Sequence, residues 1–223
     1  MKLCKGNSGV KNKGTPVAKT IAEANALAVR LGIADRADFT GIDISHANML
    51  IQRLVDIRQQ FPQLPQLEYI GRNIGKSSKV IAWCQMRPEK GKGYVPKKMI
   101  LNQVYASAKK PPEKFNEYMT SKWWPVGCNS FKSVIDHEIG HYLDYSFSKS
   151  GLRADKQIAR LFSLYGGKKE KIMRNNVSEY ASKKTTEFIA ECWAEYCNNP
   201  NPRAAAKAVG ERIIELYKAK GAN

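Results

Sequence analysis

Residues 131–144 read Phe-Lys-Ser-Val-Ile-Asp-His-Glu-Ile-Gly-His-Tyr-Leu-Asp, with two histidines four positions apart. On an α-helix this spacing puts His137 and His141 one turn apart on the same face, so both imidazoles can reach one metal ion at about 2.0–2.1 Å. Glu138 follows on the helix, where its carboxylate can take a proton from a metal-bound water whose pKa zinc lowers to about 7. Gly140 has no side chain and would let another element approach closely. The stretch predicts a helical zinc site with Glu138 as its general base.

A catalytic zinc ion usually has three protein ligands and one open position. The chain has only three histidines, and the third, His46, is predicted near the start of a helix with no partner at ligand spacing. A carboxylate or another distant group must therefore complete the site. The stretch 186–196 offers Glu187, Glu191 and Glu195 at a period of four.

Such an acidic stripe, taken alone, is more often a solvated face of a helix. Here it shares its side with two alanines, as expected where helices pack closely, and it is acidic in a basic chain. Glu187 is therefore a candidate ligand. Glu191, one turn on, is a candidate hydrogen-bond partner for the second nitrogen of a zinc-bound histidine, whereas we expect Glu195 to be exposed.

The region around these two stretches, about 130–196, resembles the gluzincin metallopeptidases, in which a glutamate from a later helix joins two histidines on zinc. It is similar in particular to the branch formed by the catalytic domain of anthrax lethal factor and its phage- and prophage-encoded relatives. The similarity lies in Ser-Glu-Tyr-Ala at 178–181, followed by Glu-Phe-Ile-Ala-Glu at 187–191. The family pattern has an asparagine near the position of Lys184, so the chain departs from it there.

The resemblance implies a set of roles for residues of this chain. His137, His141 and Glu187 would bind one Zn²⁺ per chain, and Glu138 would be the general base. Tyr180 would place its hydroxyl beside the oxyanion that develops during hydrolysis. The substrate would be a protein or peptide that lies extended along an edge strand of the sheet, here expected near 99–106.

Hydrophobic periodicity outside the site predicts an α+β fold. Residues 1–18 are rich in Lys, Gly, Asn and Ser, which is typical of a flexible basic tail. Short stretches rich in β-branched and aromatic residues predict strands at 67–71, 79–86 and 99–106. After Ala106 we expect only helices, one of them opening at Pro111 or Pro112. Helices are predicted at 19–31, 45–60, 129–147, 154–165, 185–197 and 202–219.

The simplest domain organisation is one zincin-like metallopeptidase domain over 19–223. Its first part, 19–128, would hold helices and a small, mostly antiparallel sheet packed with the active-site helix. Its second part, 129–223, would be the C-terminal helical region that carries the zinc site.

The net charge of +17, from 37 basic and 20 acidic residues, is the strongest compositional signal. Such a field attracts polyanions, so contact with nucleic acid or acidic proteins is expected alongside simple solubility. Five cysteines without a Cys-x-x-Cys pair predict free, mostly buried thiols and a reducing compartment. The sequence shows no signal peptide or membrane span, which favours a cytoplasmic or virion-associated setting.

Three functions compete at this point. The first is an active zinc endopeptidase. The second is a catalytically idle zincin fold that serves as a phage head-associated or nucleic-acid-binding protein, although Glu138 is intact. The third is a regulatory zincin that cleaves repressors, a class that shares the histidine motif but not the Ser-x-Tyr segment at 178–180.

Overall fold

The computed structural model describes residues 15–73, 80–107 and 113–221. Most of the predicted 1–18 tail, and Pro111 and Pro112, lie outside these ranges. The end of that tail belongs to the folded part, because Ala18 is buried. The Ala18 N–H donates to Asn48 Oδ1 at 2.9 Å, and Asn48 Nδ2 donates back to the Ala18 carbonyl at 2.9 Å. The tail prediction was therefore too long at its C-terminal end.

The described chain divides into two compact units. The first holds the described residues up to 85 together with 97–107, and the second holds 86–96 together with 113–221. The elements of the first unit are α1 (Ile21–Arg30), β1 (Ala34–Asp38), α2 (Ile44–Gln60), β2 (Leu67–Arg72) and α3 (Gln103–Ala106); β3 (Ala82–Glu89) and β4 (Gly93–Leu101) run from one unit into the other.

The two long helices of the first unit begin where side chains cap them. Thr20 Oγ1 accepts from the Glu23 N–H at 3.2 Å at the start of α1, and Asp43 accepts from the Ser45 N–H at 2.9 Å at the start of α2. Both helices agree with the predicted ranges. His46 is buried in α2, and its Nδ1 lies 3.0 Å from the Ala106 carbonyl, so its role is structural.

The sheet is mixed, with the strand order β1-β2-β4-β3. β1 pairs with β2 in parallel, as does β2 with β4, while a turn at 90–92 joins β3 to β4. The expectation of a mostly antiparallel sheet was therefore wrong. β1 was missed because its five residues, Ala-Asp-Arg-Ala-Asp, carry no run of large apolar side chains.

The predicted edge strand at 99–106 is a second correction. Met99 pairs with Ile70 of β2, and β4 lies between β2 and β3, so its backbone groups are not available to an added strand. The chain then turns into α3, where Asn102 Oδ1 accepts from the Val104 N–H at 3.1 Å as an N-cap. The polar cap side chain ends the strand earlier than the apolar pattern suggested.

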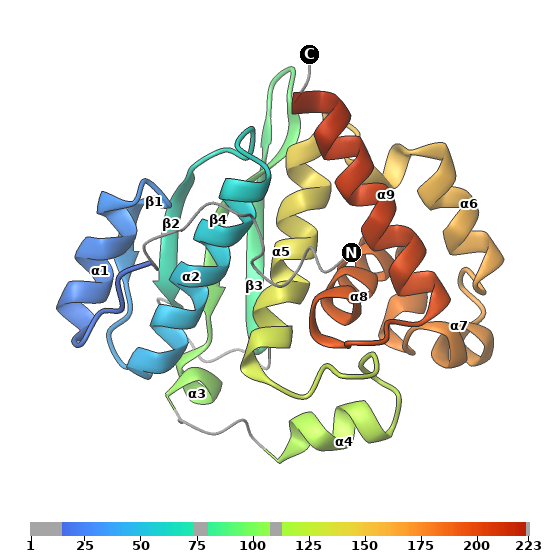
Figure 1. The fold of residues 1–223 in the computed structure, drawn as a ribbon, viewed down its shortest axis with the longest axis horizontal. Coiled ribbons are helices and arrows are strands. Elements are labelled where there is room, and N and C mark those ends of the chain that lie inside the picture. Colours follow the sequence, from blue (N-terminus) through green and yellow to red (C-terminus); the bar gives the residue numbers. More distant parts are fainter. Residues whose placement is uncertain (1–14, 74–79, 108–112, 222–223) are drawn as a thin grey trace. The chain divides into compact units, whose positions relative to one another are not determined.

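From Lys114 onward, the part of the second unit that the structure describes contains helices and no strand, as predicted for the chain after Ala106 (Figure 1). One helix, α7, was not expected, because its seven residues are mostly polar. The elements are α4 (Lys114–Thr120), α5 (Phe131–Phe147), η1 (Leu152–Ala154), α6 (Lys156–Leu164), α7 (Glu170–Asn176), η2 (Tyr180–Ser182), α8 (Thr185–Asn198) and α9 (Ala204–Gly221).

Helix α5 carries the two histidines and begins at a capping box. Ser130 Oγ accepts from the Ser133 N–H at 3.3 Å, and the Ser130 N–H donates to Ser133 Oγ at 3.2 Å. Gly140 then lets α8 approach closely, because a Cβ at this position would lie 2.6 Å from the Ala190 Cα. This contact fixes which faces of α5 and α8 meet.

Helix α9 packs against α8 (Figure 1). The Tyr217 hydroxyl donates to the Leu143 carbonyl of α5 at 2.6 Å, and Arg212 pairs with Asp155, the N-cap residue of α6, at 2.8 Å. Among the described residues, no helix combines the length and apolar character needed to cross a membrane.

We predict that Gly140→Ala lowers the free energy of unfolding by about 1–3 kcal/mol, because the new methyl overpacks the interface with α8. Alanine alone would raise helix stability by about 1 kcal/mol relative to glycine, so the sign of the change is diagnostic. Urea unfolding of the metal-free protein measures it. Removing the Ala190 methyl as well should not restore stability, because the blocking atom is a backbone Cα. An equally stable or more stable single variant would contradict the close contact.

Candidate metal centre

Three ligand atoms from α5 and α8 converge on one point. His137 Nε2 and His141 Nε2 lie 3.2 Å apart, and Glu187 Oε2 lies 3.4 Å from the first and 3.2 Å from the second. Ligands held tetrahedrally at about 2.0–2.1 Å from zinc lie roughly 3.3–3.4 Å from each other. The three atoms therefore have the spacing of three corners of a zinc tetrahedron.

The hydrogen bonding of these groups also fits a cation. Glu187 Oε2 is buried and has no hydrogen-bond partner among the described residues, although it faces both imidazoles. A buried carboxylate oxygen without a donor is unfavourable by about 1–3 kcal/mol or more. A divalent cation at the centre of the three atoms would remove this penalty, so the residues fit a zinc ion.

Helix α8 presents Glu187 in its ionised form. Burial alone would raise the pKa of this carboxyl, but the contacts with His137 and His141 outweigh burial and hold the pKa well below its usual range. Glu187 also lies in the first turn of α8, where the positive end of the helix dipole favours a negative charge. The side chain is thus a ready ligand at neutral pH.

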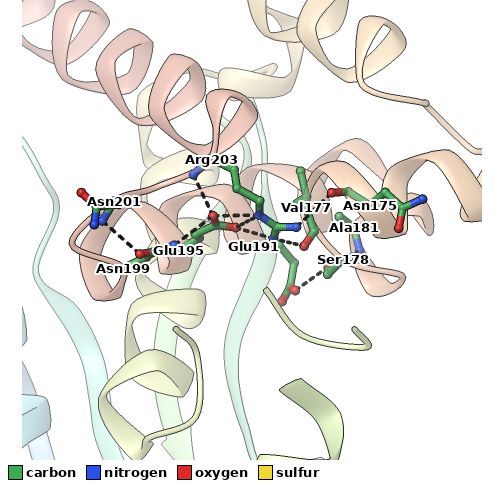
Figure 2. Close-up of polar contacts among 9 residues, drawn as sticks. All are labelled: Asn175, Val177, Ser178, Ala181, Glu191, Glu195, Asn199, Asn201 and Arg203. Carbon is green, nitrogen blue, oxygen red and sulfur yellow. Dashed lines mark hydrogen bonds and ion pairs between the residues drawn. The ribbon is translucent and has the colours of Figure 1, made fainter. Parts of the chain in front are cut away.

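Glu191 orients His137 through the ring nitrogen that does not face the metal position. Its Oε1 lies 2.7 Å from His137 Nδ1, and its Oε2 accepts a hydrogen bond from Ser178 Oγ at 2.7 Å. The Ser178 hydroxyl accepts in turn from the Ala181 N–H at 3.1 Å (Figure 2). Burial alone would lower the pKa of His137, but the nearby carboxylates of Glu187 and Glu191 outweigh burial and raise that pKa. With Nδ1 held by Glu191, the Nε2 atom is left to face the metal position.

Glu138 and Tyr180 lie close to the same centre. Glu138 is buried next to His137 on α5, and its charge helps to raise the pKa of both His137 and Tyr180. Tyr180 is on η2, with its ring centroid 6.0 Å from that of His137. Burial, followed by the charges of Glu187 and Glu191, raises the pKa of Tyr180. Its hydroxyl therefore stays protonated and can donate a hydrogen bond.

The expectation that Glu195 is exposed was wrong. Its side chain is 0% exposed and pairs with Arg203 at the start of α9, with Nη2–Oε2 at 2.6 Å and Nε–Oε1 at 3.0 Å (Figure 2). Arg203 also donates to the carbonyls of Val177 and Asn175, which lie one and three residues before Ser178. The ion pair therefore ties α8 to the segment that carries Ser178 and Tyr180.

Two residues of the site had no sequence signal of their own. Ser178 was quoted only as part of the family pattern, yet it fixes the Glu191 carboxylate. Trp123 was not predicted at all, and its ring lies 5.4 Å from that of Tyr180. Residues 123 and 124 are both tryptophan and lie in a loop without periodicity, so only the fold could show that Trp123 lies beside the site.

The cysteines do not contribute to this centre in the described chain. In the described chain no disulfide joins Cys84, Cys128, Cys192 or Cys197, and the first three are buried, as predicted. Burial, and then the nearby carboxylates, raise the pKa of the Cys128 and Cys192 thiols, which disfavours the thiolate form that binds metals. His137, His141 and Glu187 form the metal-ligand cluster found in the described ranges.

Comparisons with known proteins returned no match to a family model, a curated protein or a solved structure. The gluzincin resemblance therefore rests on the sequence motifs alone. The geometry of the three ligand atoms is an independent observation, because it depends on how α5 and α8 pack.

We predict that Glu191→Gln weakens zinc binding about tenfold or more, because His137 loses the carboxylate that orients its ring. Competition with a chromophoric chelator measures the dissociation constant. Glu170→Gln on the exposed side of α7 is the matched control and should bind zinc like the unaltered protein. Equal affinities for all three proteins would mean that Glu191 does not support the metal centre.

Proposed function

We propose that this protein is a zinc-dependent endopeptidase that hydrolyses peptide bonds of a protein substrate. The observation that carries the proposal is the spacing of His137 Nε2, His141 Nε2 and Glu187 Oε2, at 3.2–3.4 Å from one another. These residues would hold one Zn²⁺ with one position open to water or substrate.

Zinc bound there would acidify a water molecule and polarise the substrate carbonyl. Glu138 lies on the same helix as the two ligand histidines, one position after His137. Its carboxylate would take the proton from the attacking water and pass it to the leaving amine. Glu191 and Ser178 would hold His137 in place during these transfers, because both of their contacts are buried or nearly so.

Tyr180 would stabilise the negative charge that develops on the carbonyl oxygen. A neutral phenol donates a hydrogen bond, and the raised pKa of Tyr180 keeps it neutral in the working pH range. Stabilisation of charge that exists only in the transition state raises turnover more than it improves substrate binding.

A second candidate is a zincin-like fold without turnover that binds nucleic acid or a phage head, and the +17 charge favours it. Glu138 favours the enzyme, because a binding protein has no chemical need for a base beside a metal.

A repressor-cleaving regulator would be a special case of the endopeptidase. A cytoplasmic or virion-associated setting belongs to the same proposal.

We predict that Glu138→Gln keeps about one zinc per chain but loses nearly all proteolysis, because the amide cannot accept the water proton. Zinc content is measured by elemental analysis, and cleavage is measured by mass spectrometry on a library of natural peptides. Glu211→Gln, on the exposed face of α9, is the control and should retain both properties. If the protein contained no zinc after chelator-free purification at neutral pH, this result would contradict the proposed enzymatic function.

We predict that Tyr180→Phe lowers kcat about 100-fold or more while KM changes little, because the lost hydrogen bond exists only in the transition state. Steady-state kinetics on the best cleaved peptide separate the two constants. Tyr94→Phe, at a 53% exposed tyrosine of β4, should change neither. If kcat and 1/KM fell equally, Tyr180 would be a binding residue and not a catalytic one.

A further inference from the structure

The loop before the site contains a strained residue. Lys122 has a φ of +62° and is the one non-glycine residue with a positive φ in the described ranges. A lysine in this left-handed conformation costs about 1–2 kcal/mol, so the surrounding contacts must hold it. We call residues 121–124 the lip.

The lip is fastened to the segment that carries Tyr180. The Arg174 guanidinium donates to the Ser121 carbonyl at 2.6 and 3.2 Å. The Glu179 N–H donates to the Lys122 carbonyl at 2.8 Å, and the Tyr180 N–H donates to the Trp123 carbonyl at 3.3 Å. These bonds offset the strain and fix Trp123 beside the metal centre.

The Trp123 ring is partly exposed and is the outermost in a row of three neighbouring rings, Trp123, Tyr180 and the metal-ligand candidate His137. The Trp123 ring lies 5.4 Å from Tyr180, which lies 6.0 Å from His137. Lys183 Nζ lies 5.5 Å from the centroid of the same Trp123 ring. By contrast, Trp124 packs against Phe115 and Tyr118, away from this row.

The surroundings of Trp123 are strongly basic. The lip contains no carboxylate, and the two carboxylates of 168–184 are already paired. Glu170 pairs with Lys183 at 3.3 Å and Glu179 with Arg174 at 3.8 Å. Lys184, the N-cap residue of α8, is exposed and its side chain makes no capping hydrogen bond. The exposed cations of these segments are Lys122, Lys168, Lys169, Lys171, Arg174, Lys183 and Lys184.

We propose that Trp123, Lys183 and Lys184 form a subsite for an acidic side chain of the substrate, so that the enzyme selects acidic peptides. This inference rests on the proposed endopeptidase function. The flat Trp123 ring would pack on the substrate chain next to the scissile bond. Lys183 would exchange its exposed pair with Glu170, which contributes little, for an aspartate or glutamate of the substrate.

Position and charge together favour a peptide over a nucleic acid at this subsite. The aromatic row starts at the zinc ligands, where the scissile peptide bond would lie, so a residue close to that bond would reach Trp123. An ion pair that forms over an aromatic ring is partly shielded from water and gains strength. The basic residues would also speed the encounter with an acidic chain at low salt.

The test compares cleavage-site profiles on the same natural peptide library. The unaltered zinc-loaded protein should cleave sites enriched in Asp or Glu within about three residues of the scissile bond. In Lys183→Glu/Lys184→Ser this enrichment should disappear, and kcat/KM for an acidic peptide should fall at least tenfold relative to its Gln counterpart. Serine at position 184 also supplies the N-cap that α8 lacks, which protects folding.

Two further variants separate the subsite from a general effect of charge. Lys218→Glu removes an exposed lysine in the last turn of α9 and should keep the acidic preference. Trp123→Ala should reduce kcat/KM for acidic peptides at unchanged zinc content, whereas Trp123→Phe should retain most of it.

Each outcome has a separate meaning. Cleavage without acidic enrichment, or enrichment that survives in Lys183→Glu/Lys184→Ser, would overturn the subsite and leave the endopeptidase in place. If cleavage does not depend on acidic residues, and Lys183→Glu/Lys184→Ser also loses binding to a fluorescent single-stranded DNA, the basic residues bind nucleic acid instead. Absence of cleavage by the zinc-loaded protein on every peptide would overturn the proposed function itself.

Discussion

The close contact between α5 and α8 is the constraint on which the candidate metal centre depends. Gly140 and Ala190 meet where no Cβ fits on Gly140, and Ile139 and Phe188, which lie close to them in the chain, are fully buried. Two ligand atoms come from α5 and one from α8. The distances of 3.4 and 3.2 Å from Glu187 Oε2 to the two histidine nitrogens are therefore a consequence of how near the two helices lie. Apolar burial supplies the free energy that keeps these polar atoms together.

The acidic side chains of α8 show how one helix face can serve three purposes. Glu187 faces the two histidines, Glu191 joins His137 to Ser178, and Glu195 binds Arg203. Buried carboxylates are tolerated only when each has a partner, and breaking such a pair destabilises a protein by about 3–5 kcal/mol. The same pairs connect α8 to the segment before Tyr180, so stability and the geometry of the site are coupled. The lip at 121–124 extends this connection to Trp123.

Much of the helical part could be predicted from the chain, whereas β1 and the pairing of the strands could not. The capped helix at 131–147 and the helix at 185–198 agree closely with their apolar periodicity. The parallel strand pairs were missed, because strand direction depends on connections between distant segments. The error on Glu195 has a similar origin, since an acidic stripe with period four looks the same whether it faces water or an arginine.

The sequence by itself determined the His137–His141 spacing, the adjacent Glu138 and the positions of the helices that carry them. These features are local, because backbone hydrogen bonds fix the geometry of a helix over a few residues. Only the tertiary structure decided that Glu187 reaches both histidines, that Glu191 and Glu195 are buried, and that Trp123 lies beside Tyr180. Those features depend on which surfaces pack together, and packing joins residues that are far apart in the chain.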